Sequence, residues 1–190
     1  FNGNNYSAEW QEEAKRRGLP IVRGAIDAYK ALQAEKNIRL FERMGVFSPV
    51  ECHARYEILV ENYIKVVSIE AKTLLEMVRR QIIPAAITYC GQVAGDVAKL
   101  SSAGVSNPNI QKHLEKASGL TSDIMERADV LEAVLNGRNK EAAVAAQAAY
   151  IHETVTVAME SLRESCDGLE AMADSKIWPI PTYTDLLHRI

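Results

Sequence analysis

A helix start followed by a long amphipathic stretch constrains the fold of this chain more than any other feature. Ser48-Pro49-Val50-Glu51 places Ser at an N-cap, Pro at the first helical position and Glu three residues after the Ser, which is the pattern of a capping box. No further proline occurs before Pro84. On a helix of about 100° per residue, one broad apolar arc holds Tyr56, Leu59, Val60, Tyr63, Val66, Val67, Ala71, Leu74, Met77, Val78 and Ile82. A helix from Ser48 to about Leu100 would be about 75 Å long, so other long helices must lie beside it.

Pro84 interrupts this stretch without ending it. Proline lacks a backbone N–H, and its ring clashes with the carbonyl four residues earlier. Residues 85–100 remain compatible with a helix and contain no new N-cap signal. We therefore expect the central helix to kink at Pro84 and to continue. Gly91 and Gly95, four residues apart, would let another helix approach closely.

Two heptad repeats follow the central helix. Asn107-Pro108 supplies an N-cap and a proline at a helix start, and Asn136-Gly137-Arg138-Asn139 reads as a tight turn between helices. The apolar seams are Ile110, Leu114, Ala117, Thr121, Ile124, Ala128, Leu131 and Leu135, and then Val144, Ala148, Ile151, Val155, Ala158, Leu162, Ser165, Leu169 and Met172. A short link makes consecutive helices antiparallel. We predict a hairpin of residues 107–135 and 139–173, packed along the central helix.

Shorter helices are expected before the central one. Ser7 is predicted to cap a helix that runs to about Arg17. A second helix is predicted from Ala25 to about Arg43, broken near Lys36-Asn37 and ended by Gly45. The fold class is thus all-α: an antiparallel long-helix bundle with a kinked central helix and an extended Pro-rich C-terminal tail.

The tail is expected to dock on a protein surface. Pro179 and Pro181 favour an extended path. Residues 178–187 also contain a cluster of large apolar and aromatic side chains, Trp178, Ile180, Tyr183, Leu186 and Leu187, which is costly to leave in water. The docking surface could be this bundle, with Trp178 as the anchor, or a neighbouring domain or subunit.

Glu70 is the one carboxylate inside the apolar arc of the central helix. A buried carboxylate must be paired or protonated, and its neighbours Val66 and Leu74 cannot pair it. We therefore expect Glu70 to be buried and bonded to a group from another helix. A structural ion pair is favoured over a catalytic role.

Composition and motifs exclude several classes of function. The formal net charge of −3 gives no electrostatic case for binding nucleic acid or an anionic membrane. No apolar run approaches the roughly 20 residues of a membrane-spanning helix. There is no glycine-rich phosphate loop, and no Glu-x-x-His motif of a di-metal helical bundle. Cys52, Cys90 and Cys166 are far apart, which argues against a disulfide framework and favours a reducing cytosol.

Three groups of residues carry a resemblance to a known family. They are Ala54-Arg55-Tyr56-Glu57-Ile58 and Arg80-Gln81-Ile82-Ile83-Pro84-Ala85-Ala86 in the centre, and the ending Trp-Pro-x-Pro-x-Tyr-x-Asp-Leu-Leu from Trp178 to Leu187. In this order they resemble the C-terminal helical region of type III glutamine synthetases, along nearly the whole chain. The first residue is Phe1, so we expect the chain to be a piece of a longer protein. Residues 1–24 would be the connecting segment from a missing upstream catalytic domain, and residues 25–190 the helical bundle domain.

The resemblance implies a function for the parent protein rather than for this chain alone. Type III glutamine synthetases join ammonia to glutamate with ATP and Mg²⁺ or Mn²⁺, and their catalytic residues lie in the upstream domain. No catalytic, cofactor-binding or metal-binding residue is assigned here, and Glu70, Pro84 and Trp178 are given structural roles. The implied partners are the upstream catalytic domain and neighbouring subunits of a cytoplasmic homo-oligomer.

Two alternatives remain at this point. The chain could be a free-standing helical interaction module that uses an exposed heptad face. It could also be a small helical metalloenzyme, although the missing histidine ligands disfavour this reading.

Overall fold

The computed structural model describes residues 3–4, 6–22, 24–181 and 183–188, and every regular element within them is helical. The chain divides into two compact units, Phe1–Ile64 and Lys65–Ile190, which are described separately. Among the residues that the structure describes, no helix has the length and hydrophobicity that a membrane span requires.

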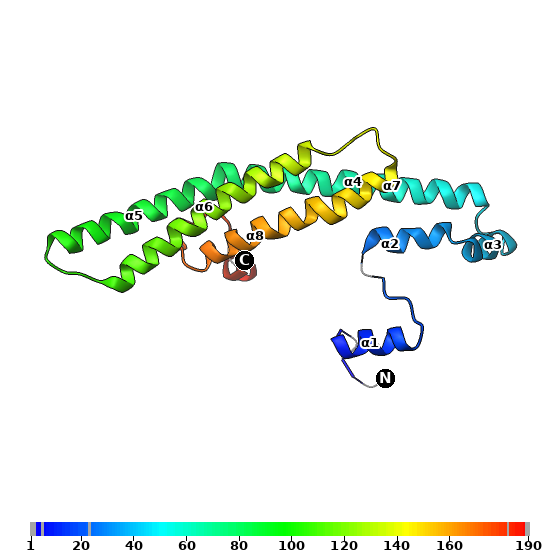
Figure 1. The fold of residues 1–190 in the computed structure, drawn as a ribbon, viewed down its shortest axis with the longest axis horizontal. Coiled ribbons are helices and arrows are strands. Elements are labelled where there is room, and N and C mark those ends of the chain that lie inside the picture. Colours follow the sequence, from blue (N-terminus) through cyan, green and yellow to red (C-terminus); the bar gives the residue numbers. More distant parts are fainter. Residues whose placement is uncertain (1–2, 5, 23, 182, 189–190) are drawn as a thin grey trace. The chain divides into compact units, whose positions relative to one another are not determined.

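The first unit begins with short helices (Figure 1). Helix α1 (Ala8–Arg16) is capped by Ser7, whose Oγ accepts the N–H of Trp10 at 3.3 Å, as predicted. The next stretch consists of α2 (Ala25–Lys30), the short 3₁₀ helix η1 (Ala31–Gln33) and α3 (Glu35–Arg43). The break falls at Ala34, with ψ 124°, and not at Lys36-Asn37. Asn37 lies inside α3, where its side-chain amide donates to the carbonyl of Ala31 at 2.7 Å and bridges the break.

Helix α4 (Pro49–Met77) starts in the first unit at the predicted capping box. The Ser48 N–H donates to Glu51 Oε2 at 2.7 Å, and the Glu51 N–H donates to Ser48 Oγ at 3.3 Å. Each side chain thus satisfies a backbone donor of the other residue. Gly45, with φ +65°, ends α3 just before this box, as predicted.

The long helix continues through Pro84, and the helix over residues 49–102 is kinked, as predicted. Between α4 and α5 (Ile83–Ser102) lies one π-helical turn, η2 (Val78–Ile82), in which the Ile83 N–H donates to the carbonyl of Val78. The five-residue spacing of this bond adds a residue to the turn just before Pro84. Proline then occupies the first turn of α5, where a missing N–H is tolerated.

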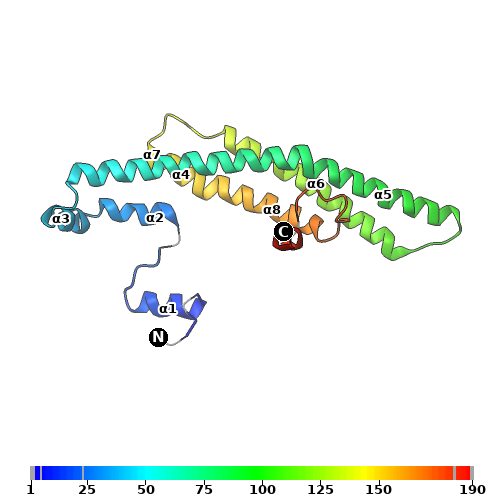
Figure 2. The ribbon, with the colours of Figure 1, turned by 180° about the vertical axis from the view of Figure 1, so that it is seen from behind.

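The second unit is completed by α6 (Pro108–Asn136), α7 (Val144–Tyr150), a second π-helical turn η3 (Ile151–Val155), α8 (Thr156–Glu170) and the short α9 (Tyr183–His188). Asn107 caps α6 by accepting the N–H groups of Asn109 and Ile110. Figures 1 and 2 both show α6 beside α5 and α8. Arg79 pairs with Glu132, and Arg127 donates to the Ser161 carbonyl. Arg79 and Tyr89 meet Glu132 and His113 in reverse order along α6. Ser161 and Gly168 likewise lie near Arg127 and Leu120 in reverse order, so α6 is antiparallel to both neighbours.

The link between α6 and α7 is longer than predicted, because the helix restarts only at Val144. Asn139 Oδ1 accepts the N–H of Glu141 at 3.0 Å and holds a turn. The Gln147 side chain donates to the carbonyls of Lys140 and Ala142. These bonds satisfy a non-helical backbone at residues 139–143, where the heptad pattern predicts a helix.

Both predicted heptad seams form the core of the second unit. Their most buried members are Ala117, Ile124, Ala128 and Leu131 on α6 and Ala148, Ile151, Val155, Leu162 and Leu169 on the facing helix. No member of either seam is exposed. The two helices meet closely where a Cβ added at Gly168 would lie 3.4 Å from Leu120 Cδ2. Gly91 and Gly95, by contrast, have open space around them, so the close approach expected there is absent from the described residues.

Candidate functional site

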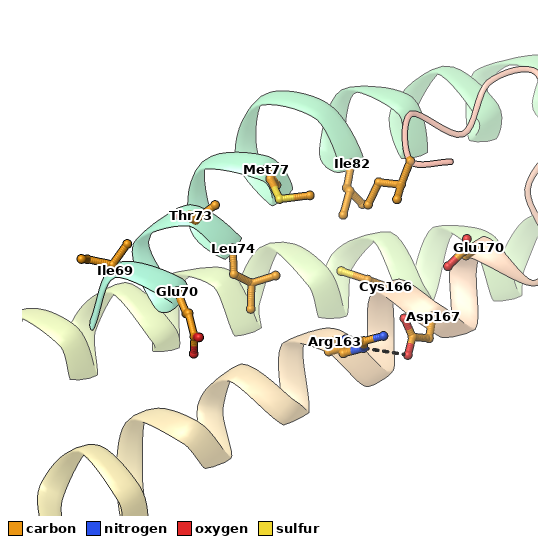
Figure 3. A pocket seen from close by; sticks show the side chains of 11 residues that line it. Ile69, Glu70, Thr73, Leu74, Met77, Ile82, Arg163, Cys166, Asp167 and Glu170 are labelled. Atoms are coloured by element: carbon orange, nitrogen blue, oxygen red, sulfur yellow. Dashed lines mark hydrogen bonds and ion pairs between the residues drawn. The ribbon is translucent and has the colours of Figure 1, made fainter. Parts of the chain in front are cut away.

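Within the described residues, no group of three or more His, Cys, Asp or Glu side chains could hold a metal ion. The feature that best fits a binding site is an apolar groove of about 470 Å³ in the second unit. We name it the α4–α8 groove. Figure 3 shows its lining, which comprises Ile69, Glu70, Thr73, Leu74, Met77, Ile82, Arg163, Cys166, Asp167, Glu170 and Ile180.

The walls of the groove come from two long helices and its end from the tail. One wall belongs to α4 and η2, the other to α8, and Ile180 follows α8 in the chain. Cys166 lines the groove and is buried. Burial raises the pKa of the Cys166 thiol to about 11, so the thiol stays protonated at neutral pH. It therefore contributes apolar surface to the groove rather than a nucleophile or a metal ligand.

Charged groups stand only at the rim of the groove. Arg163 is paired with Asp167 on its own helix, with 3.4 Å between Nε and Oδ2. Glu70 on α4 and Glu170 on α8 form no ion pair or hydrogen bond within the described part of the chain. The rim therefore presents one uncompensated carboxylate on each wall.

The prediction that Glu70 is buried and bonded to another helix is wrong. Glu70 is exposed, and its carboxylate points away from the ribbon of α4 in Figure 3. The side chains that α4 and η2 bury in this region are Val67, Ala71, Leu75 and Val78. This stripe lies to one side of Glu70 on the helix, so the carboxylate remains in water and requires no partner.

A polar cluster that no sequence pattern predicts joins α5, α6 and the segment that follows α8. The Tyr89 hydroxyl on α5 donates to the carbonyl of Met172 at 2.8 Å. His113 Nε2 on α6 lies 2.5 Å from the Tyr89 hydroxyl oxygen. Because the hydroxyl proton goes to Met172, His113 must donate through Nε2. Burial raises the pKa of Tyr89, which keeps the phenol neutral. The cluster fixes the chain just after α8 and is structural in character.

The tail docks in part. Trp178 is 8% exposed, which agrees with the predicted anchor, and Ile180 lines the groove. Leu186 and Leu187, however, are 64% and 74% exposed, so these two side chains do not dock on this bundle, and docking of α9 on a neighbouring domain or subunit stays a prediction. The side chain of Tyr183 lies outside the described residues.

The Trp178 indole carries one unusual feature. Its Nε1 is buried and has no hydrogen-bond partner in the described part of the chain. A buried donor without an acceptor is unfavourable, so apolar contact of the ring must outweigh this cost. The sequence indicates an apolar anchor here but cannot indicate where the N–H points.

Comparison with known proteins identifies what the chain is similar to. Residues 1–101 match the family model described as the glutamine synthetase C-terminal domain. The chain is 32% identical to a type-3 glutamine synthetase of Dictyostelium discoideum over 98% of its own length and 26% of that protein. It is 31% identical to a glutamine synthetase of Butyrivibrio fibrisolvens, and the match covers 98% of this chain and 27% of that protein. The chain thus spans about a quarter of the length of the curated relatives it matches.

Proposed function

Because the chain belongs to the glutamine synthetase C-terminal domain family, we propose that it is the C-terminal helical region of a type III glutamine synthetase. The observation that carries this proposal is the coverage: nearly all of the chain, but only about a quarter of each relative, takes part in the match. Synthetases of this family use ATP and a divalent metal. Residues 1–24 would connect the helical region, residues 25–190, to an upstream catalytic domain.

In this proposal the chain assembles the enzyme and does not carry its chemistry. The described residues contain no cluster of metal-ligating side chains, and the thiol in the groove is held neutral. What the second unit offers is surface for other protein, namely the apolar α4–α8 groove and the exposed Leu186 and Leu187 of α9. The partners would be the catalytic domain and neighbouring subunits of a cytoplasmic homo-oligomer.

Expression of the full reading frame that contains this chain tests the proposal. We expect the complete protein to form glutamine from glutamate, ammonia and ATP and to assemble into an oligomer measurable by native mass spectrometry. The 190-residue chain alone should show neither synthetase activity nor micromolar ATP binding by calorimetry. ATP binding of that strength would overturn the division of labour proposed here.

A matched pair of variants in the complete protein tests the assembly role. Replacing both exposed leucines of α9 with serine, Leu186→Ser and Leu187→Ser, should reduce the oligomer. The control is Val130→Ser with Val157→Ser, which removes exposed apolar groups from α6 and α8 and should leave assembly unchanged. Equal behaviour of the two pairs would count against α9 as an assembly contact.

The alternative is a free-standing helical interaction module. A reading frame without an upstream catalytic domain would favour it, whereas a contiguous catalytic domain would exclude it. The exposed apolar groove is compatible with both functions, so the reading frame is the decisive observation.

A further inference from the structure

The apolar arc of α4 serves two surfaces at once. In the second unit the side chains that α4 and η2 bury form a stripe of Val67, Ala71, Leu75 and Val78. Beside this stripe the helix carries a second set, Val66, Ile69, Thr73, Leu74 and Met77, most of which lines the groove. Ile69 is 57% exposed and Val66 is 42% exposed. The helix therefore carries more apolar side chains than the core of the unit buries. The remaining ones lie along the groove, where they are partly exposed to water.

The shape of the groove suits a helix better than an extended peptide. Both walls are α-helices whose backbone groups are bonded internally, so they offer no free edge for an added strand. From Ile69 to Ile82 the α4 wall runs for about 20 Å at 1.5 Å per residue, which matches three to four turns of a partner helix. Docking must therefore depend on side chains, as in helix-in-groove recognition.

The charges at the rim specify the partner further. Both arginines beside the groove are already paired within their own helices, Arg163 with Asp167 and Arg80 with Glu76 at 2.9 Å. Glu70 and Glu170 remain without an ion pair in the described part of the chain, one on each wall. A partner with basic residues on both edges of its apolar stripe would meet one carboxylate on each side.

We propose that the α4–α8 groove binds an amphipathic α-helix of another polypeptide, with an apolar stripe seated between α4 and α8 and Lys or Arg residues facing Glu70 and Glu170. This proposal concerns the groove itself and does not depend on the function proposed above. It commits to a basic helix because the rim is acidic on both sides. A small apolar molecule, for which a volume of about 470 Å³ is also sufficient, is the competing occupant.

Binding of three synthetic peptides to the 190-residue chain tests the proposal. The first is an 18-residue peptide with leucine at helical spacing and lysine elsewhere, labelled for fluorescence anisotropy. The second replaces each lysine with glutamate. The third has the composition of the first in an order that forms no apolar face. We expect the ordered Leu/Lys peptide to bind at least ten times more tightly than either of the others.

Variants of the chain locate the site. Glu70→Lys with Glu170→Lys should weaken binding of the Leu/Lys peptide at least tenfold and should strengthen binding of the Leu/Glu peptide. The matched control is Asp123→Lys with Glu126→Lys, which makes the same charge change at exposed positions of α6 outside the groove. Ile69→Asp, at an exposed position, should weaken binding of the Leu/Lys peptide without unfolding the chain, as circular dichroism would verify.

Three results would overturn the proposal. The control pair could weaken binding as much as the groove pair, the peptide without an apolar face could bind as tightly as the ordered one, or Ile69→Asp could leave binding unchanged. Failure of all three peptides to bind, together with uptake of a small apolar dye that Ile69→Asp abolishes, would also overturn it and would make the groove a small-molecule site.

Discussion

At the level of single residues, the start of α4 is stabilised by Ser48 and Glu51, whose side chains each accept a hydrogen bond from the other residue's backbone N–H. Ser48→Ala removes the oxygen that accepts the Glu51 N–H. Loss of an N-cap side chain costs about 1 kcal/mol in free energy of unfolding, measurable by urea denaturation. Ser48→Asn retains an N-cap acceptor and should lose much less. Equal losses in the two variants would show that the serine acts through something other than its cap.

The same box predicts a pH dependence. The Ser48 N–H, and then the Ser48 hydroxyl, hold the pKa of Glu51 below its ordinary value of 4.5. Because the pKa is lower in the folded than in the unfolded chain, Glu51 stabilises the fold above the unfolded pKa, and this contribution is lost as the pH falls through the folded pKa. NMR titration should therefore find the Glu51 pKa below 4.5. In Ser48→Ala the Glu51 pKa should rise only part of the way to its ordinary value, since the larger cause of the lowering, the backbone N–H of residue 48, remains.

Trp178 is the second residue whose environment yields a quantitative expectation. Trp178→Ala should lower the free energy of unfolding by about 3–5 kcal/mol, because it removes a large buried side chain. Trp178→Phe should cost distinctly less, since it keeps an aromatic ring and removes the buried N–H that lacks an acceptor. Thermal and chemical denaturation of both variants would measure the difference. An unchanged melt for Trp178→Ala would show that the ring contributes nothing to this chain's stability.

At the level of elements, comparison of the two π-helical turns shows whether proline or side-chain burial accompanies such a turn. Pro84 lies two residues after the end of η2, but η3 contains no proline and has none nearby. In both turns, residues at the first and last positions are buried: Val78 and Ile82 in η2, Ile151 and Val155 in η3. Burial four residues apart on the same face is thus common to both turns, whereas proline is not.

Pro84→Ala should therefore leave η2 in place. The substitution restores a backbone N–H that can form a hydrogen bond, which stabilises the fold. It also makes the unfolded chain more flexible, which destabilises the fold. The free energy of unfolding should therefore change by less than about 1 kcal/mol. Amide exchange and NMR chemical shifts should still report the bond from the Ile83 N–H to the Val78 carbonyl. Conversion of residues 78–82 to a regular α-helix would show that proline, and not packing, creates the turn.

Local patterns predicted most elements, because caps and heptads act over a few residues. Ser48, Asn107 and both seams lie where the sequence places them. The errors arise where a neighbour distant in sequence decides. The width of the α4 arc predicts many buried positions but does not show which part of the arc faces the core. The sequence therefore predicts a buried Glu70, whereas the structure exposes it. The pairing of Tyr89 with His113 and the carbonyl of Met172 joins segments 24 and 83 residues apart, which no local pattern encodes.

At the level of the whole molecule, the helices differ in how many side chains they bury. Helices α1 and α2 each bury a single side chain, Ala14 and Ile26, and α3 buries none. Helix α6 alone buries Ala117, Thr121, Ile124, Ala128 and Leu131. Short helices without a buried face are marginal in water, so stability should be unevenly distributed along the chain.

Hydrogen exchange should reveal this difference directly. Helices with few buried contacts open at low free energy, whereas core helices open only on global unfolding. We expect the amides of α1, α2 and α3 to be protected roughly 100-fold less than those at the centres of α6 and α8. Leu131→Ala provides the complementary test, because loss of a fully buried leucine should cost about 2–5 kcal/mol. It should lower protection throughout α6 and α8 while leaving α1–α3 almost unchanged. Uniform protection along the chain, or an equal response of α1–α3 to Leu131→Ala, would show that the molecule opens as one cooperative body.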